Sequence, residues 1–330
     1  MTIDDFLKEW RDGSPTLLVH TSGSTGAPKP LLVEKRRMEA SARITCDFLG
    51  LREGDTALLC MSLDYIAGKM MVVRSLVRHL RLTVVEPSGY PRWEGALDFA
   101  AMVPLQVWNL LQTGEGRGRL MSIRHLIIGG GAISEPLADS LRTFPNAVWS
   151  TYGMTETLSH VALRRLSGLE ASDWYEPFEG VGMGLDADGC LVIDAPQVCS
   201  QRLFTNDIGE LAPDGRRFRI LGRKDNVVQS GGVKIQIEQV ERRLQKEMPV
   251  PFLITRRADS KFGEVVTMLV ETTDAATTVP LCRACCERVL DKFEQPRLFV
   301  PVARLPLTAT GKPARAEAAR LAAESDAVEA

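Results

Sequence analysis

The chain has 330 residues, more than one ordinary domain holds, so at least two domains are expected. Its 40 Lys and Arg residues against 42 Asp and Glu give a formal net charge of -2, which argues against a protein that binds nucleic acid through a strongly basic surface. No run of about 18 apolar residues occurs, so no membrane span is expected.

The seven cysteines are an odd number in a long chain, which indicates free thiols and a reducing, cytoplasmic location. Cys282, Cys285 and Cys286 lie in one predicted helix, and no second Cys or His pair is near them in the sequence to complete a tetrahedral site. We therefore expect buried helix cysteines there, not a metal centre.

The first two thirds of the chain alternates β-rich and helical segments. Residues 1–10 predict an acidic amphipathic helix and not a signal peptide. Buried strands are predicted at residues 56–60, 82–86, 125–128 and 147–150, and the end of a strand at residues 17–19. Helical patterns between them include residues 68–79 and 135–143. This alternation predicts an α/β layered domain with a largely parallel sheet.

The pattern changes after about Gly180. Turn signals at residues 186–189 and 213–215 predict a small antiparallel sheet. A compact α+β module follows, with helices predicted at 237–246 and 279–293, strands at 251–255 and 264–271, and a helical tail after Arg315. We predict an N-terminal α/β domain (1–221) with an antiparallel β subdomain and a small C-terminal α+β domain (222–330), joined by a glycine- and charge-rich segment at 221–226.

A polar loop follows the first predicted strand. It combines hydroxyl groups, glycines and a lysine, namely Thr21, Ser22, Gly23, Ser24, Thr25, Gly26 and Lys29. The glycines let backbone N–H groups approach a ligand, and the hydroxyls and the ammonium suit a polyphosphate. The loop lacks the Gly-Lys-Ser/Thr ending of a Walker motif. Taken alone, a polar surface turn is the commoner interpretation.

A second motif spans residues 149–157, after a predicted strand, where an α/β sheet presents its ligand-binding edge. Tyr152 offers a flat ring for stacking on a base, and Gly153 permits close backbone approach. Thr155 can donate to a phosphate, and Glu156 is an oxygen ligand suited to Mg²⁺. The alternative is a helix start with Thr as N-cap and Glu in the first turn.

Three further signals are weak when taken singly. The glycines at 129–131 lie between a predicted strand and a helix, and they let main chain lie flat against a planar group. Asp207 is expected in a turn between strands, where a carboxylate can accept both hydroxyls of a ribose. Lys312 lies in a Gly/Thr/Pro loop near the C-terminus. A solvated turn aspartate and a surface lysine remain the ordinary alternatives.

Taken together, five segments resemble the adenylate-forming superfamily of acyl-CoA synthetases, luciferases and peptide-synthetase adenylation domains. They occur in the family's order, at residues 21–26, 152–157, 205–211, 222–225 and 306–312. The resemblance covers about residues 17–315. Within the superfamily, the short length and residues 152–164 are most similar to the o-succinylbenzoate–CoA ligases of menaquinone biosynthesis.

The resemblance implies an AMP-forming acid–thiol ligase that uses ATP, Mg²⁺ and CoA. It assigns the loop at 21–29 to the β- and γ-phosphates, Thr155 to the α-phosphate and Glu156 to Mg²⁺. It further implies that Lys312 bridges the substrate carboxylate and the α-phosphate. The residues that it assigns to adenine and ribose are Gly129, Gly130, Gly131, Ala132, Thr151, Tyr152, Gly153, Asp207 and Arg223.

For the second half-reaction, the resemblance implies that the C-terminal domain is mobile and rotates about a hinge at 223–226, which includes Asp225. The segment that would then line a pantetheine tunnel is Gln229, Ser230, Gly231 and Gly232. The polar segment at 223–226 would also fit an inert linker. The acyl pocket would be lined by Tyr65, Lys69, Ser159 and His160. Lys69 or His160 could receive a second substrate carboxylate, and a solvated helix lysine remains the alternative for Lys69.

One departure from the family pattern is the short segment, residues 1–20, before the phosphate loop, which predicts a more open acyl pocket. A degenerate chain or one that needs a partner is also left open. Two other functions remain: an adenylation enzyme that loads another acid onto CoA or a carrier protein, and a truncated, non-catalytic nucleotide-binding protein. A monomer and a homodimer are both compatible with the sequence.

Overall fold

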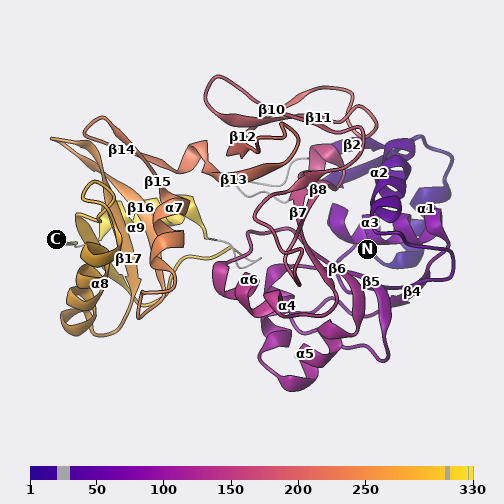
Figure 1. Ribbon diagram of the computed structural model, residues 1–330, viewed down its shortest axis with the longest axis horizontal. Helices are drawn as coiled ribbons and strands as arrows, with labels where there is room; N and C mark the ends of the chain where they lie inside the picture. Colours follow the sequence, from indigo (N-terminus) through magenta and orange to yellow (C-terminus); the bar gives the residue numbers. More distant parts are fainter. Residues whose placement is uncertain (21–29, 309–312, 326, 330) are drawn as a thin grey trace.

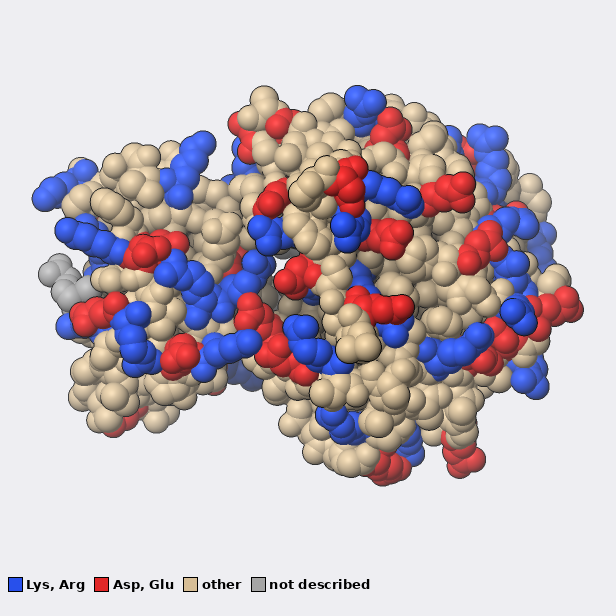
Figure 2. Space-filling model, in the orientation of Figure 1, with Lys and Arg blue, Asp and Glu red and all other residues tan. Residues whose placement is uncertain are grey.

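The computed structural model describes residues 1–20, 30–308, 313–325 and 327–329. Two lobes lie side by side along the long axis of the molecule, and residues from 227 onward form the smaller one (Figure 1). Acidic and basic side chains are interspersed over the visible face of both lobes, with no large area of one sign (Figure 2). No helix of the described residues is long and apolar enough to cross a membrane.

A seven-stranded sheet organises the larger lobe. Neighbouring strands run parallel from β4 through β3, β5 and β6 to β7, and the last two strands are antiparallel. The order across the sheet is β4 (Arg81–Val84), β3 (Thr56–Leu59), β5 (Leu97–Met102), β6 (Ile123–Ile128), β7 (Ala147–Gly153), β8 (His160–Arg165) and β9 (Glu176–Pro177). The predicted α/β fold with a largely parallel sheet is therefore confirmed.

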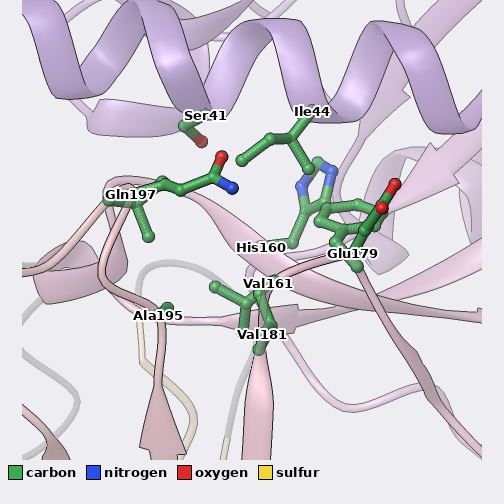
Figure 3. A pocket seen from close by; sticks show the side chains of 11 residues that line it. Ser41, Ile44, His160, Val161, Glu179, Val181, Ala195 and Gln197 are labelled. Atoms are coloured by element: carbon green, nitrogen blue, oxygen red, sulfur yellow. The ribbon is translucent and has the colours of Figure 1, made fainter.

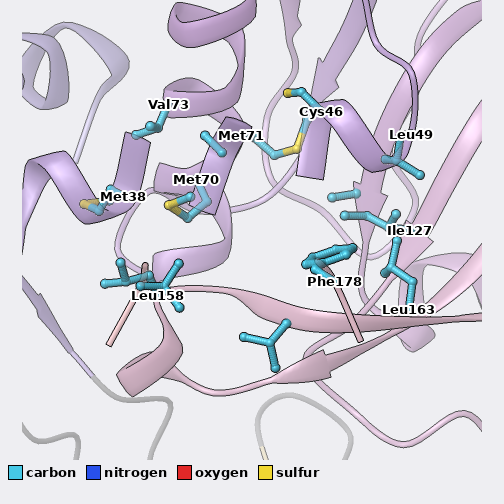
Figure 4. Close-up of a cluster of buried hydrophobic side chains, with 14 of the residues drawn as sticks. Met38, Cys46, Leu49, Met70, Met71, Val73, Ile127, Leu158, Leu163 and Phe178 are labelled. Atoms are coloured by element: carbon cyan, nitrogen blue, oxygen red, sulfur yellow. The ribbon is translucent and has the colours of Figure 1, made fainter. Parts of the chain in front are cut away.

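Helices cover both faces of this sheet, so apolar side chains form a core on each side. One core lies against α1 (Ile3–Arg11), α2 (Lys35–Phe48) and α3 (Ile66–Arg78), and it includes Met38, Cys46, Met70 and Phe178 (Figure 4). The other lies against α4 (Pro104–Leu111), α5 (Gly114–Met121) and α6 (Glu135–Arg142).

Two details of the sheet differ from the prediction. The segment predicted as a buried strand at 82–86 forms β4, an edge strand with mostly exposed side chains, because β3 is its only partner among the described strands. The central strand β5 was not predicted, although its residues are buried between β3 and β6. Its sequence, Leu-Asp-Phe-Ala-Ala-Met, contains no β-branched residue, so strand propensity gives little signal.

Two smaller sheets complete the larger lobe. The hairpin of β1 (Thr16–His20) and β2 (Pro30–Glu34) pairs His20 with Pro30. A four-stranded antiparallel sheet follows, as predicted, in the order β10 (Gly182–Leu185), β11 (Cys190–Asp194), β12 (Leu203–Leu211) and β13 (Phe218–Arg223).

The smaller lobe begins after a 3₁₀ turn, η2 (Lys224–Asn226). Its sheet contains β14 (Val227–Ser230), β15 (Val233–Gln236), β16 (Phe252–Asp259), β17 (Gly263–Glu271), β18 (Leu298–Val302) and β19 (Val328–Glu329). The helices are α7 (Ile237–Leu244), α8 (Ala275–Val289) and α9 (Arg315–Glu324). Asp274 caps α8, so this helix begins four residues before the predicted Val279. Its three cysteines are buried, as expected.

Candidate active site

The glycine segment after β6 takes the course that the sequence predicts. It leaves the strand and reaches α6, whose N-cap is Ser134. A Cβ atom on Gly129 would lie 2.3 Å from the hydroxyl oxygen of Thr151, and Gly130 has a φ of +77°. Side chains larger than hydrogen are therefore excluded where the ends of β6 and β7 approach one another.

The motif at 149–157 begins within β7, so the prediction that it follows the strand is wrong for its first five residues. Residues 155–157 form one short 3₁₀ turn, η1 (Thr155–Thr157), with Met154 at its N-cap. Thr155 is buried and Glu156 is exposed. A Cβ atom on Gly153 would lie 2.2 Å from the carbonyl oxygen of Ser159, which explains why glycine is needed there.

Tyr152 and Asp207 are brought together by β7 and β12. The phenol of Tyr152 donates to the Asp207 carboxylate at 2.9 Å, and the Arg223 guanidinium donates to its other oxygen at 3.1 Å. The Tyr152 ring is only 6% exposed and lies edge-on to Phe218, with 5.1 Å between centroids. Burial, and then the Asp207 charge, raises the pKa of this phenol.

The expectation that Asp207 lies in a turn is wrong. It is inside β12, where it pairs with Arg223 of β13, because the strand continues through the whole segment to Leu211. The pairing places both side chains in the cluster with Tyr152. Three of the residues assigned to adenosine, on three different strands, therefore converge at one point.

The predicted hinge residue, Asp225, lies in η2 between the two lobes. Its carboxylate accepts from Arg223 at 3.0 Å and from Asn206 at 3.2 Å, so it is tied to the larger lobe. The side-chain amide of Gln236, in the smaller lobe, donates to the carbonyl oxygen of Arg223 at 2.9 Å. Polar contacts therefore surround the joint from both sides.

The segment predicted to line a thiol tunnel forms the tip of the β14–β15 hairpin. Gln229 and Ser230 end β14, and the two glycines make the turn. Gly231 and Gly232 have φ values of +58° and +87°, which other residues rarely adopt. The Gly231 N–H donates to the carbonyl oxygen of Phe262 at 2.9 Å, which holds the turn against the neighbouring hairpin.

The residues assigned to the phosphates, 21–29, and the catalytic candidate Lys312 lie outside the described residues. The segments on either side of them pair as follows. His20 and Pro30 are paired across β1 and β2. Near Lys312, Leu307 and Pro313 form a β-bridge, and the Ala314 N–H donates to the Pro306 carbonyl oxygen at 3.0 Å.

The four residues assigned to the acyl pocket separate into two places. Tyr65 precedes α3 and is 49% exposed. Lys69 is buried, and its ammonium lies 3.4 Å from the Met1 sulfur and 5.6 Å from the centre of the Phe6 ring, so it faces α1. Ser159 and His160 lie together, with 3.1 Å between the hydroxyl and the Nδ1 atom.

The structure adds Arg74 to Ser159 and His160, a residue that the sequence analysis missed. It is 1% exposed, and its Nη2 atom donates to the Ser159 hydroxyl at 2.7 Å. Among the described residues no carboxylate pairs with this guanidinium, and its Nε atom has no hydrogen-bond partner. Burial lowers the pKa of Arg74 to about 10, so it stays positive at neutral pH.

The position of Arg74 on α3 explains why Lys69 does not share its environment. Five helical residues correspond to a rotation of about 140°, so the two side chains leave the helix in different directions. The signal in the sequence was an arginine directly after the apolar run Met70–Val73. A cation beside such a run is buried only when other elements of the fold pack over it, and the sequence does not show which elements pack there.

The donor set around Glu156 fits Mg²⁺ held jointly with phosphates. The described residues contain no group of three or more His, Cys, Asp or Glu that could hold a metal by themselves. Mg²⁺ commonly takes one or two protein carboxylates and completes its shell with substrate phosphates and water. The exposed Glu156 carboxylate beside Thr155 provides that kind of ligand.

Comparison with known proteins identifies the family. The model of the AMP-binding enzyme family matches residues 6–215, well over half of the chain. The chain belongs to the AMP-binding enzyme family. The chain is 35% identical to an acyl-CoA synthetase (AMP-forming)/AMP-acid ligase II-like protein from Dyadobacter fermentans. The match has a TM-score of 0.64 and covers 94% of this chain and 90% of that chain.

Two longer relatives carry more specific names. The 2-succinylbenzoate–CoA ligase of Bacillus mycoides is 26% identical over an alignment of 340 positions, and the match covers 93% of this chain and 70% of the relative. The structure of O-succinylbenzoate Coenzyme A Synthetase from Bacillus subtilis, in complex with ATP and magnesium ion, matches with a TM-score of 0.72 and 22% identity. It covers 91% of this chain and 69% of that chain, and it supports the adenylate-forming fold.

Proposed function

We propose that this protein is an ATP-dependent acid–thiol ligase that converts o-succinylbenzoate to o-succinylbenzoyl-CoA. The observation that carries the choice of acid is the buried Arg74, for which the described residues supply no carboxylate partner. A buried charge is costly unless it is paired, so a second carboxylate on the substrate would complete the site. The names of the 2-succinylbenzoate–CoA ligase relatives point to the same acid.

In the first half-reaction an oxygen of the substrate carboxylate attacks the α-phosphorus of ATP, and the bond to pyrophosphate breaks. Both reactants are anions, so the protein must neutralise charge and hold them in line. The loop at 21–29 would hold the leaving pyrophosphate and Thr155 the α-phosphate. Lys312 would contact both reactants, as a compact cation on a flexible stem can do. Bound Mg²⁺, held by Glu156, would neutralise phosphate charge.

The adenosine part would lie beside the cluster of Tyr152, Asp207 and Arg223. Asp207 can accept the ribose hydroxyls while Arg223 holds its orientation, since the two side chains are already joined at 3.1 Å. The close approach at Gly129 and Thr151 leaves main chain, without side chains, to face the planar base. These contacts position ATP and take no part in bond making.

In the second half-reaction the thiol sulfur of CoA attacks the acyl carbon, and AMP leaves with the bonding electron pair as the thiol proton is lost. Rotation about Asp225 would withdraw Lys312 and bring the turn at Gln229–Gly232 toward the acyl-adenylate. The polar joint around η2 supports this proposal, because its contacts are exposed hydrogen bonds that can exchange with water.

The test measures pyrophosphate released from ATP and Mg²⁺ with a set of acids: o-succinylbenzoate, benzoates and fatty acids. We expect release with o-succinylbenzoate and formation of a thioester when CoA is added. Release with that acid but transfer only to a phosphopantetheinylated carrier protein would contradict CoA as the acceptor. Binding of ATP without release with any acid would contradict an enzymatic function.

A further inference from the structure

A continuous chain of hydrogen bonds leads from Arg74 to the backbone of α2. The Arg74 Nη2 atom lies 2.7 Å from the Ser159 hydroxyl, which lies 3.1 Å from the Nδ1 atom of His160. On the other side of the ring, Nε2 lies 3.1 Å from the hydroxyl of Thr45, and that hydroxyl lies 3.0 Å from the carbonyl oxygen of Ser41. Except for Ser159, all of these residues are buried.

The donors and acceptors fix the direction in which each of these hydrogen bonds is donated. The Thr45 hydroxyl donates to the Ser41 carbonyl, so it must accept from Nε2–H of His160. A neutral imidazole with its proton on Nε2 accepts at Nδ1, and there it receives the Ser159 hydroxyl proton. The Ser159 oxygen is then free to accept from Arg74. Burial first, and then the charge of Arg74, lowers the pKa of His160 well below its ordinary value.

Packing holds the imidazole in this orientation. The His160 ring meets the Phe178 ring at an angle of 62°, with 5.4 Å between centroids. Together with Ile44, Val161 and Gln197 these rings line a small cavity of about 10 Å³ (Figure 3). A space of this size holds about one water molecule, which leaves the ring little room to swing away from Ser159.

We propose that His160 and Thr45 are positioning residues for substrate selection: they fix the Ser159 hydroxyl as an acceptor, which aims Arg74 at the second carboxylate of the acid. This inference rests on the proposed function. His160 acts through Ser159 and does not contact the substrate. Its ring must remain neutral with the proton on Nε2, because a proton on Nδ1 would compete with Arg74 for the Ser159 oxygen.

The kinetic test compares two acids in wild-type and variant proteins. One acid is o-succinylbenzoate, and the other is 4-oxo-4-phenylbutanoate, which lacks the carboxylate on the ring. In Thr45→Val we expect KM for o-succinylbenzoate to rise about fivefold to tenfold, with kcat within twofold. The kcat/KM for the one-carboxylate acid should stay within twofold. The matched control is Thr267→Val, which alters a buried threonine in the other lobe. It should leave KM and kcat unchanged for both acids.

Two variants of the histidine separate its two nitrogen atoms. In His160→Asn the amide oxygen can take the place of Nδ1 and accept from Ser159, whereas in His160→Gln the amide nitrogen can replace only Nε2. We therefore expect the Asn variant to retain more of the preference for o-succinylbenzoate than the Gln variant. Equal loss of kcat/KM for both acids, or an unchanged preference in folded Thr45→Val and His160→Gln proteins, would overturn the inference.

A measurement without substrate distinguishes this inference from the proposed function. Nitrogen-15 NMR of the wild-type protein, labelled at its four histidines, should show His160 neutral with the proton on Nε2 at pH 6, and Thr45→Val should change this signal. An Nδ1–H tautomer or a charged ring would overturn the inference whatever the activity. A wild-type protein with the expected tautomer that releases no pyrophosphate with o-succinylbenzoate would contradict the proposed function alone.

Discussion

The phenol of Tyr152 and the carboxylate of Asp207 are joined by a hydrogen bond of 2.9 Å, which links the end of β7 to the middle of β12. The large sheet and the four-stranded sheet are thereby connected at the place where the nucleotide is proposed to bind. A substitution at either residue should therefore lower the affinity for the nucleotide more than the affinity for the acid.

We predict that Asp207→Asn raises KM for ATP at least tenfold, because hydrogen bonds to a charged acceptor contribute about 1.5–3 kcal/mol. Tyr152→Phe should raise KM for ATP less, since it removes only one partner of that carboxylate. Steady-state pyrophosphate release at varied ATP measures both effects. Asp214→Asn, in the distant turn between β12 and β13, is the control. A parallel rise in KM for the acid would argue against a nucleotide-specific role.

We predict that Lys312→Ala slows adenylation at least a hundredfold, since a cation placed between two reacting anions acts mainly on the transition state. Thioester formation from a supplied acyl-adenylate should stay within threefold of wild type. Single-turnover assays of the two half-reactions make the comparison, with the exposed Lys292→Ala as control. Similar losses in both half-reactions would show that Lys312 has another role.

Arg315, at the start of α9, forms a bidentate ion pair with Glu241, with N–O distances of 2.7 and 2.6 Å. We predict that Arg315→Ala destabilises the smaller lobe by about 3 kcal/mol, because it leaves the half-buried Glu241 without its counter-ion. Thermal unfolding followed by circular dichroism measures this. Arg320→Ala, whose ion pairs on α9 are exposed, should have little effect. Equal effects of the two variants would contradict the prediction.

The two lobes also meet through Lys246, whose ammonium lies 2.9 Å from Asp139 and 3.5 Å from Glu135 of α6. We predict that Lys246→Glu separates the lobes, because it places three like charges together. Small-angle X-ray scattering should then report a larger radius of gyration. Lys261→Glu, an exposed change elsewhere in the smaller lobe, should leave the scattering curve unchanged. An unchanged curve for Lys246→Glu would show that other contacts set the arrangement.

Stability should fall as the pH drops below about 6.5. Burial lowers the pKa of His160 well below its ordinary value and that of His125 to about 4. The folded protein therefore keeps these rings neutral while the unfolded chain takes up protons, which favours unfolding as pH falls from 6.5 toward 4. For His160 the slope approaches about 1.4 kcal/mol per pH unit.

Urea denaturation between pH 7.5 and 5 measures this slope. The window lies above the ordinary range of carboxyl groups, so histidines dominate the titration. His125→Gln should reduce the slope without altering the preference between the two acids. A free energy of unfolding that does not change between pH 6.5 and 5 would contradict the prediction.

The sequence predicted most of the fold because parallel strands covered on both faces are short apolar runs. β6 and β7 were found for this reason. β5 was missed because alanine and methionine have no clear strand preference, and its identity as a strand depends on the neighbours that pair with it. β4 was taken as buried because its sequence does not show that it lies at the edge of the sheet.

The site was predictable where its chemistry lies in consecutive residues. The glycines after β6 and the segment around Tyr152 and Glu156 are of this kind. Arg74 was not predictable, since its burial depends on how α3 packs against the loop that carries Ser159. Lys69 was a candidate for the same role in the sequence, and only its position on the helix directs its ammonium to α1.

The arrangement of the cysteines allows a fluorescent label to be attached at one position. Six of the seven thiols are buried, and Cys199, which follows β11, is the half-exposed exception. Burial raises the pKa values of Cys60 and Cys286 to about 12, so neither forms a reactive thiolate at neutral pH. A maleimide dye should therefore attach at Cys199 alone in the folded wild-type chain. A second cysteine introduced in the smaller lobe would then make a distance pair for following the lobes through the reaction cycle.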